Sequence, residues 1–336
     1  NAGGFIGSQG DIDITASQVD NVLAGNLTSE KNLRLSAGGL NNQNGEIQAL
    51  GDAVLDLGSG RLDNAAGLLR AGGSLQVNAG VIDNQNTRAS GLGIEGSTLL
   101  LQAAQVDNRA GALRADDSLT VRSSGVLDNG QGLVSSTGQV TVADTLPGKN
   151  LAVSNSGGTL IAGKALSIDS ATLGGDGSIL STGDLSLALA SGFINNGALQ
   201  ANGTLSLQLQ GALDNQAGLL AGQAVNVTAS ALNNRANAEI SAAEVTLNAA
   251  SNVDNRGLID AQITRINTAV LNNLGSGRIY GDQLSLAVQN LNNDVENGQA
   301  TGQAALVQNA SATIEALGDL SLASAVLRNT NEHFST

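Results

Sequence analysis

Short stretches in which aliphatic residues alternate with polar residues recur along the whole chain. In residues 74–79 (SLQVNA), Leu75, Val77 and Ala79 are apolar and the residues between them are polar. This period of two is typical of a β-strand that has one face buried. We expect strands of the same kind at 33–35, 119–121, 166–168, 185–187, 205–207, 245–247, 284–286 and 320–322.

Two further short segments accompany each alternating segment. A Gly-led segment such as 67–71 (GLLRA) comes before it, and a segment such as 80–84 (GVIDN) follows it. The Gly-led segment recurs at 111–115, 197–201 and 257–261. Three strands of three to five residues, joined by tight corners, describe one triangular coil. Strands this short cannot turn back as long hairpins in every repeat, so we expect each coil to pair in parallel with its neighbours.

The third segment of each repeat ends in an aliphatic residue, then Asp or Asn, and then Asn. This motif occurs twelve times with a usual spacing of 18 to 24 residues, and one gap of 67 holds degenerate copies at 153–155 (VSN) and 173–175 (LGG). A fixed period near 21 is typical of a solenoid. The last residues of the motif copies are Asn21, Asn42, Asn64, Asn84, Asn108, Asn129, Asn196, Asn215, Asn234, Asn255, Asn273 and Asn293.

These patterns predict an all-β protein, a right-handed parallel β-helix with three short strands per coil. About sixteen coils of about 21 residues fit the chain, and we expect one elongated domain over residues 1–336. Coils that stack about 4.8 Å apart would form a rod on the order of 75 Å long. The right hand follows from the strong preference of parallel crossover connections.

The repeated Asn has a structural explanation. Asn tolerates the left-handed backbone region at a tight corner, and identical Asn side chains one coil apart can hydrogen-bond in a ladder. We expect the glycines that follow three residues later, such as Gly67 and Gly218, to supply a second position of positive φ. The twelve residues are therefore predicted to form a structural Asn ladder, not a ligand site.

Two departures from the period predict longer corners. Residues 143–150 (ADTLPGKN) enlarge one step and contain Pro147, the only proline, which a central strand would reject. We expect these residues to form a protruding loop that carries Asp144, Pro147 and Lys149. Residues 85–96 lengthen a second corner more modestly, and the step from Asn293 to Asn309 is short.

The composition indicates how wide the core is and which classes of partner are excluded. Hydrophobic residues make up 41%, yet the chain has only three Phe, one Tyr and no Trp, which indicates a narrow core of similar aliphatic layers. A net charge of −14 argues against nucleic acid and anionic membranes as partners. No stretch approaches 18 apolar residues, so we predict no membrane span. The absence of Cys excludes disulfides and thiolate chemistry.

The sequence offers few combinations of residues that could form a catalytic site. The single histidine, His333, has no second His or Cys near it in the sequence. No loop is long enough to hold two carboxylates at one substrate bond, as general acid and base catalysis requires. We predict no catalytic, cofactor-binding or metal-binding residues and no enzyme activity. A polysaccharide-cleaving enzyme on a β-helix is the third-ranked alternative.

The repeat resembles the haemagglutinin repeats of filamentous haemagglutinin and of the toxin-delivering proteins of contact-dependent growth inhibition. The resemblance lies in the Leu-Asp-Asn corner, the Gly-led strand and the Leu-Ser-Leu strand, and it covers essentially the whole chain. Residues 329–334 (NTNEHF) are similar to the segment that ends such arrays. The chain begins inside the repeat pattern, and we expect it to be a fragment of a longer protein.

This resemblance implies a bacterial exoprotein, secreted or held at the cell surface, that an outer-membrane two-partner transporter exports. Two functions remain open. In the first, the chain is a structural stalk that projects a distal receptor-binding, adhesive or toxin module, so that a target-cell receptor or glycan would be bound through flanking regions. In the second, the chain is itself an adhesive module that binds a glycan or receptor through residues 143–150 or 88–95.

Overall fold

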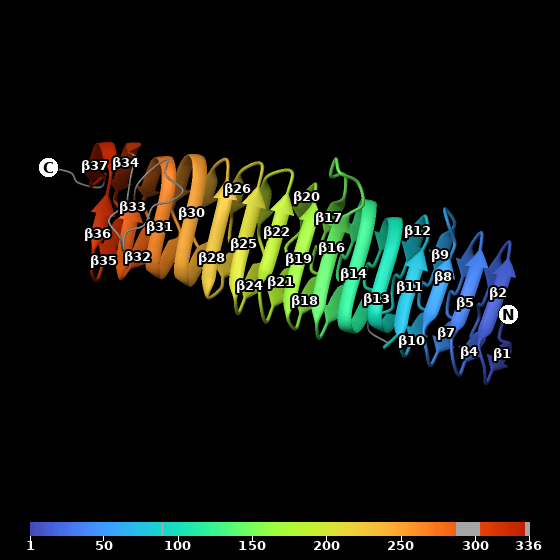
Figure 1. The fold of residues 1–336 in the computed structure, drawn as a ribbon. Helices are drawn as coiled ribbons and strands as arrows, with labels where there is room; N and C mark the ends of the chain where they lie inside the picture. The colour runs from blue at the N-terminus through green and yellow to red at the C-terminus, as the bar shows by residue number, and fades with distance from the viewer. Residues whose placement is uncertain (89–90, 287–302, 333–336) are drawn as a thin grey trace. The chain divides into compact units, whose positions relative to one another are not determined.

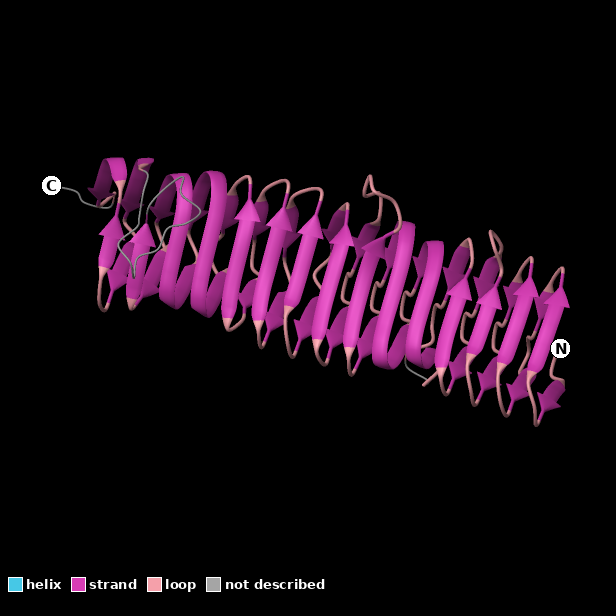
Figure 2. Cartoon of the chain, viewed as in Figure 1, coloured by secondary structure: helices cyan, strands magenta, loops and turns pink. Residues whose placement is uncertain are grey.

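Every regular element that the computed structural model describes is a β-strand, over residues 1–88, 91–286 and 303–332 (Figures 1 and 2). The strands pair in parallel and stack as a β-solenoid of about 15 turns. The predicted parallel β-solenoid is therefore confirmed, and its right hand stays a prediction. The chain falls into two compact units, residues 1–178 and 179–336. The prediction of a single domain is not tested by this division and stays a prediction.

Unit 1 consists of short strands, most of them two to six residues long. They are β1 (Phe5–Ser8), β2 (Ile12–Ala16), β3 (Val19–Asp20), β4 (Asn26–Ser29), β5 (Leu33–Ala37), β6 (Leu40–Asn41), β7 (Glu46–Ala49), β8 (Ala53–Asp56), β9 (Arg61–Asp63), β10 (Leu68–Ala71), β11 (Ser74–Asn78), β12 (Val81–Asp83), β13 (Gly93–Asp107), β14 (Ala112–Asp128), β15 (Leu133–Ser136), β16 (Gln139–Asp144), β17 (Ala152–Ser154), β18 (Thr159–Ala162), β19 (Ala165–Ser170) and β20 (Thr172–Gly174). Three consecutive strands make one coil, and β4, β5 and β6 pair in register with β7, β8 and β9.

Unit 2 repeats the same arrangement, and β24, β25 and β26 pair in register with β27, β28 and β29. The strands from residue 178 onward are β21 (Ser178–Ser181), β22 (Leu185–Leu189), β23 (Phe193–Asn195), β24 (Ala198–Ala201), β25 (Thr204–Leu209), β26 (Leu213–Asn215), β27 (Leu219–Ala221), β28 (Ala224–Ala229), β29 (Leu232–Asn234), β30 (Glu239–Asn255), β31 (Leu258–Leu274), β32 (Arg278–Gly281), β33 (Gln283–Leu286), β34 (Ala304–Ala310), β35 (Thr313–Ala316), β36 (Leu320–Leu322) and β37 (Ser324–Thr330).

Within the described residues, four coils depart from the predicted pattern of three short strands. In these coils β13, β14, β30 and β31 each run for 15 to 17 residues around all three sides. β13 alone pairs with β10, β11 and β12. Its corners are register shifts in the pairing with β14, between Gly96 and Thr98 and between Ala103 and Gln105. A corner made by a bulge keeps the backbone nearly extended, so the strand bends and continues.

The core is a set of stacked layers of similar aliphatic side chains. Leu27, Ile47 and Leu69 lie one above another in register, and each is at most 2% exposed. Among the described residues, Phe193 belongs to the buried core at 4% exposure, whereas Phe5 is 73% exposed. Because every coil presents the same cross-section, one type of side chain fills each layer, and no large aromatic ring is needed to bridge a wider space.

The alternation of buried and exposed positions predicts that the same substitution has very different effects on stability at two adjacent residues. In β25, Leu207 is 1% exposed and Gln208 is exposed. Leu207→Asp should lower the free energy of unfolding by more than the ~2–5 kcal/mol typical of truncating a buried Leu, because an unpaired carboxylate would face the core. Gln208→Asp should change it by less than about 0.5 kcal/mol. Chemical denaturation of both variants measures the difference, and equal tolerance would contradict the assigned faces.

Candidate functional site

The repeated Asn side chains of unit 1 form a continuous chain of hydrogen bonds, here called the first ladder. Asn21 Nδ2 donates to Asn42 Oδ1 at 2.8 Å, and Asn42 Nδ2 donates to Asn64 Oδ1 at 2.7 Å. Each member donates to the member on the following coil. In order, the members are Asn1, Asn21, Asn42, Asn64, Asn84, Asn108, Asn129 and Asn155. Asn155, from a degenerate copy of the motif, therefore belongs to the first ladder.

From Asn1 to Asn129, each carboxamide of the first ladder donates both to the next ladder Asn and to a main-chain carbonyl oxygen. Besides its ladder bond, Asn42 Nδ2 donates to the carbonyl oxygen of Leu68 at 3.0 Å, and Asn84 Nδ2 donates to the carbonyl oxygen of Ala112 at 2.9 Å. Asn42, Asn64 and Asn84 are 0% exposed. A buried amide left without partners costs about 1–3 kcal/mol, so a fully paired ladder holds its coils in register.

Unit 2 contains a second ladder, whose members are Asn195, Asn215, Asn234, Asn255, Asn273, Asn309 and Asn329. The predicted member Asn293 lies outside the described residues. Asn273 Nδ2 donates directly to Asn309 Oδ1 at 2.8 Å, which is 36 residues further along the chain. Asn273 and Asn309 are therefore consecutive members of the second ladder.

The prediction that Asn196 belongs to the ladder is wrong. Asn196 is exposed, whereas Asn195 is 1% exposed and donates to Asn215 Oδ1 at 2.8 Å. The sequence pattern fitted the motif to Ile194, yet Ile194 is 53% exposed and Phe193 takes the buried position. A shift of one residue moves every side chain of a strand to the opposite face, so the burial of Phe193 determines which Asn joins the ladder.

The backbone explanation for the repeated Asn and Gly is also wrong. Positive φ occurs two residues after several ladder members, as at Ala66 (52°) and Ala110 (48°), and not at Asn64 or Gly67. Gly67 is needed because a Cβ there would lie 2.3 Å from the carbonyl oxygen of Asn42. Gly218 has no positive φ either, and its Cβ would lie 2.1 Å from Asn195 Nδ2. Close packing of each corner on the preceding coil therefore selects Gly.

Gly175 stands where the period would place the next Asn after Asn155. Its φ is +107°, and a Cβ would lie 2.5 Å from the main chain of Asn155. The last member of the first ladder, Asn155, donates instead to the carbonyl oxygen of Ser178 at 3.3 Å. The first ladder therefore ends within unit 1.

The residue before the ladder Asn also has a defined role, which the sequence analysis missed. Asp63 Oδ1 accepts the main-chain N–H of Ala65 at 3.2 Å, and Asp128 Oδ1 accepts that of Gly130 at 3.0 Å. This Asx turn needs an Asp or Asn side chain two residues before the donor. The alternation of Asp and Asn at this motif position was the signal that could have identified it.

Arginine side chains reinforce some of these Asp residues. Arg235 holds both oxygens of Asp214, with Nε–Oδ1 at 2.7 Å and Nη2–Oδ2 at 3.0 Å. These hydrogen bonds lower the pKa of Asp214 against the opposing effect of its partial burial. The stabilisation is therefore present above the ordinary Asp pKa and is lost as pH falls through the lower pKa of the folded state.

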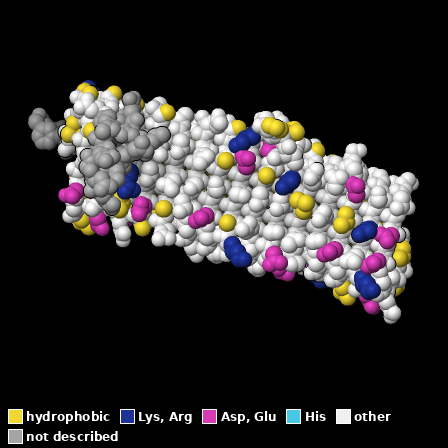
Figure 3. Space-filling view, viewed as in Figure 1, with side chains coloured by type: hydrophobic (Ala, Val, Ile, Leu, Met, Phe, Trp, Pro, Cys, Tyr) yellow, Lys and Arg dark blue, Asp and Glu magenta, His cyan; other side chains and the backbone are white. Residues whose placement is uncertain are grey.

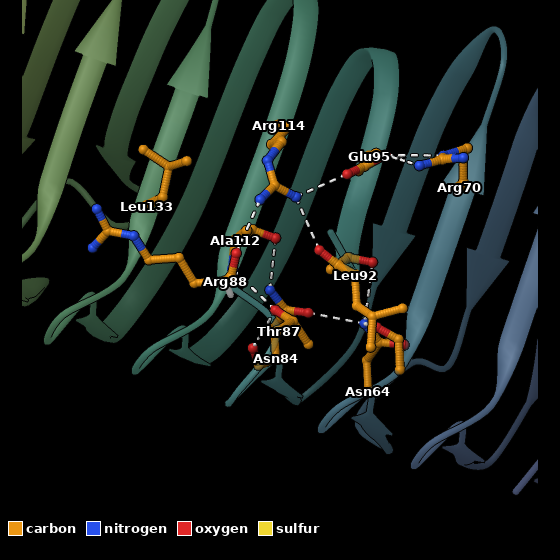
Figure 4. A network of polar contacts seen from close by, with 12 residues as sticks. Asn64, Arg70, Asn84, Thr87, Arg88, Leu92, Glu95, Ala112, Arg114 and Leu133 are labelled. Atoms are coloured by element: carbon orange, nitrogen blue, oxygen red, sulfur yellow. Dashed lines mark hydrogen bonds and ion pairs between the residues drawn. The ribbon is translucent and has the colours of Figure 1, made fainter. Parts of the chain in front are cut away.

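The lengthened corner at 85–96 is bonded to the coils that follow it (Figure 4). Thr87 lies where other coils have Gly, and its hydroxyl donates to the carbonyl oxygen of Asn84 and accepts the N–H of Ala112, both at 3.0 Å. One coil further on, the equivalent N–H of Leu133 binds the carbonyl oxygen of Gly111. The Thr87 hydroxyl therefore replaces a main-chain acceptor.

Charged side chains tie the same corner to both neighbouring coils (Figure 4). Glu95 Oε2 accepts Arg70 Nη2 at 2.6 Å, and Glu95 Oε1 accepts Arg114 Nη1 at 2.8 Å. Arg88 Nη1 donates to the carbonyl oxygens of Gln131 at 2.6 Å and of Gly132 at 3.2 Å. In the predicted binding patch at 88–95, the charged side chains of Arg88 and Glu95 are therefore engaged in contacts within the chain.

The loop that carries Asp144, Pro147 and Lys149 lies between β16 and β17 and extends from the strands (Figure 1). Asp144 accepts the main-chain N–H groups of Leu146 at 2.8 Å, Leu151 at 2.6 Å, and Asn150. Burial raises the pKa of Asp144, but these N–H groups and the Lys149 charge together lower it below its usual value.

The other loop residues divide between a fixed base and an exposed tip. Lys149 Nζ lies 2.5 Å from Asp169 Oδ1, whereas Pro147 is exposed and Leu146 is 48% exposed. The loop is thus bonded at its base and open to solvent at its tip.

Among the described residues, no group of three or more His, Asp or Glu side chains is placed to hold a metal ion. His333 lies outside these residues. The described ranges also contain no helix long and apolar enough to cross a membrane.

Comparison with known proteins identifies one family. The family model of the haemagglutinin repeat matches the chain in overlapping segments at residues 1–58, 52–100, 95–160, 137–188, 161–217, 180–287 and 283–335. No significant match is found among curated protein sequences or among solved structures.

The second ladder predicts unequal effects of truncating two Asn residues. Asn215→Ala should lower the free energy of unfolding by about 1–3 kcal/mol, because it leaves the Asn195 donor and the Asn234 acceptor buried without a partner. Asn196→Ala is the matched control, and it should change stability by less than about 0.5 kcal/mol because Asn196 is exposed. Denaturation curves compare the two, and a larger loss for Asn196→Ala would restore the original motif assignment.

Proposed function

Because the chain belongs to the haemagglutinin-repeat family, we propose that it is a filamentous stalk of a large secreted bacterial surface protein. In this role it projects a distal receptor-binding, adhesive or toxin module away from the cell. The fold itself fits an adhesin-like stalk, since its coils repeat one cross-section. A stack in which each coil contacts only its neighbours gains length without needing a new core.

The observation that carries this proposal is the internal pairing of the repeat's polar groups. The buried ladder amides bind each other and the main chain, and the Asp residues before them bind corner N–H groups. On the face seen in Figure 3, the hydrophobic and charged side chains are scattered among polar atoms and do not gather into one broad patch. Such a surface suits a spacer better than a large protein interface.

The remaining parts of the proposal follow from the family. The chain would reach the outside through an outer-membrane two-partner transporter and would remain secreted or at the cell surface. Carriage of a toxin, as in contact-dependent growth inhibition, is one form of this role. Catalysis has no part in this proposal, which ranks a polysaccharide-cleaving enzyme third.

The alternative function is an adhesive module that itself binds a glycan or receptor. The specific observation in its favour is the exposed tip of the loop at 143–150, where Leu146 is 48% exposed beside Pro147. The corner at 88–95 favours it less, because Glu95 and Arg114 bind each other.

A deletion of one complete coil tests the stalk role. Removing residues 196–215 takes out β24, β25 and β26 and joins Asn195 to Gln216, so that β23 and β27 to β29 keep the spacing of a normal repeat. Because the neighbouring coils then meet through equivalent strands, we expect the full-length parent to fold, to be exported and to display its distal module at the wild-type level. Surface labelling of that module measures the result, and loss of display from this folded variant would contradict a passive spacer.

A deletion of part of a coil is the matched control. Removing residues 204–215 takes out β25 and β26 but leaves β24 (Ala198–Ala201), so the coil is incomplete and both stability and display should fall. The adhesive alternative has its own test, in which a short Gly-Ser corner replaces residues 143–150. Saturable binding of the isolated chain to cells or glycans that this replacement abolishes would favour the adhesive module.

A further inference from the structure

One groove in unit 2 is built around the only tyrosine of the chain. Tyr280 points outward from β32, with Asp260 of β31 and Glu315 of β35 beside it in register. The groove has a volume of about 410 Å³, and Asp282 and Leu317 also line it. Leu317 is 83% exposed. An aromatic ring thus lies between carboxylates that come from the coils on either side.

The carboxylates of this groove have no cationic partner among the described residues. None of the ion pairs in those residues involves Asp260, Asp282 or Glu315. Arg278 lies two residues before Tyr280 on the same strand, yet it forms none of these pairs. The equivalent carboxylate of unit 1, Glu95, is held by two arginines. The Tyr280 groove therefore combines an aromatic face with carboxylates that form no ion pair with the described residues.

The spacing of these groups selects the kind of cation. Asp260 and Glu315 lie two coils apart, roughly 10 Å along the stack, and no set of described acidic residues converges to hold a metal ion. An ammonium or guanidinium group differs from a metal ion because it can lie over an aromatic ring, and an aliphatic stem lets it rest along an apolar wall. Leu317 and the Tyr280 ring provide that wall.

We propose that the Tyr280 groove binds an organic cation, an ammonium or guanidinium group carried on an aliphatic stem. The cation would lie against the ring of Tyr280 and between the carboxylates of Asp260 and Glu315. A free polyamine and a Lys or Arg side chain of a basic peptide share this chemistry. The site is independent of the stalk role, because an outward-facing groove can be occupied or removed without altering the ladder.

The composition of the chain supplies a direct measurement. With one Tyr and no Trp, the intrinsic fluorescence of the full chain arises from Tyr280 alone. We expect spermidine, and separately a short lysine-containing peptide, to change this fluorescence saturably in low-salt buffer. Binding of both would identify the amine group as sufficient, and binding of the peptide alone would identify a protein partner. Magnesium chloride at matched ionic strength should leave the fluorescence unchanged.

Calorimetric titration of substituted chains separates the groove from the general negative charge. Tyr280→Leu should weaken binding about two- to fivefold, the loss expected for an exposed cation–π contact. Tyr280→Phe keeps the ring and should retain the wild-type affinity. Asp260→Asn combined with Glu315→Gln should weaken binding further. Asp116→Asn, which removes one charge from an exposed position of unit 1, should have no effect.

Three results would overturn the proposal. The first is the absence of any saturable fluorescence change with either ligand. The second is equal affinity of the wild-type chain and Tyr280→Leu. The third is an equal loss of affinity in Asp116→Asn and in the double variant at Asp260 and Glu315, because binding would then follow total charge. Thermal melting of each variant checks that it is folded.

Discussion

A carboxamide that is removed from water has to be hydrogen-bonded, and this requirement organises the whole repeat. The Asn at each corner is buried, so its side chain needs one acceptor for each N–H and one donor for its oxygen. The next coil supplies the Asn oxygen and a main-chain carbonyl, as Asn42 finds in Asn64 and Leu68. A coil displaced by one residue would lose these partners. The ladder therefore complements the aliphatic layers, which favour burial but do not by themselves define the register.

The same requirement explains the small residues around the ladder. Each carboxamide sits against the following corner, so that a Cβ on Gly67 would collide with the carbonyl oxygen of Asn42. Where the corner is longer, as at 85–96, Thr87 keeps the corner paired by offering its hydroxyl. At Gly175 the ladder is interrupted, and each unit carries an uninterrupted ladder of its own. The repeat thus tolerates changes in loop length, provided that buried donors and acceptors remain matched.

Much of this architecture could be predicted from the sequence. The period of two in segments such as 205–207 gave the strands, and the spacing of the Asn motif gave the coil. The ladder position near residue 195 could not be obtained in this way, because Phe193-Ile194-Asn195-Asn196 fits the motif in two phases. Only the packing of Phe193 against the core decides between them. The pairing of Glu95 with Arg70 and Arg114 was hidden for a related reason, since the lengthened corner displaces Glu95 from its usual distance after the ladder Asn.

The central claim, that buried Asn amides hold the coils in register, is tested most directly by hydrogen exchange of the Asn side chains. Nuclear magnetic resonance of the full chain, with assigned side-chain amides, measures this exchange residue by residue. The account predicts strong protection of Asn42, Asn215 and Asn234 and rapid exchange of the exposed Asn196. Rapid exchange of Asn42, Asn215 and Asn234, at the rate of Asn196, would contradict it.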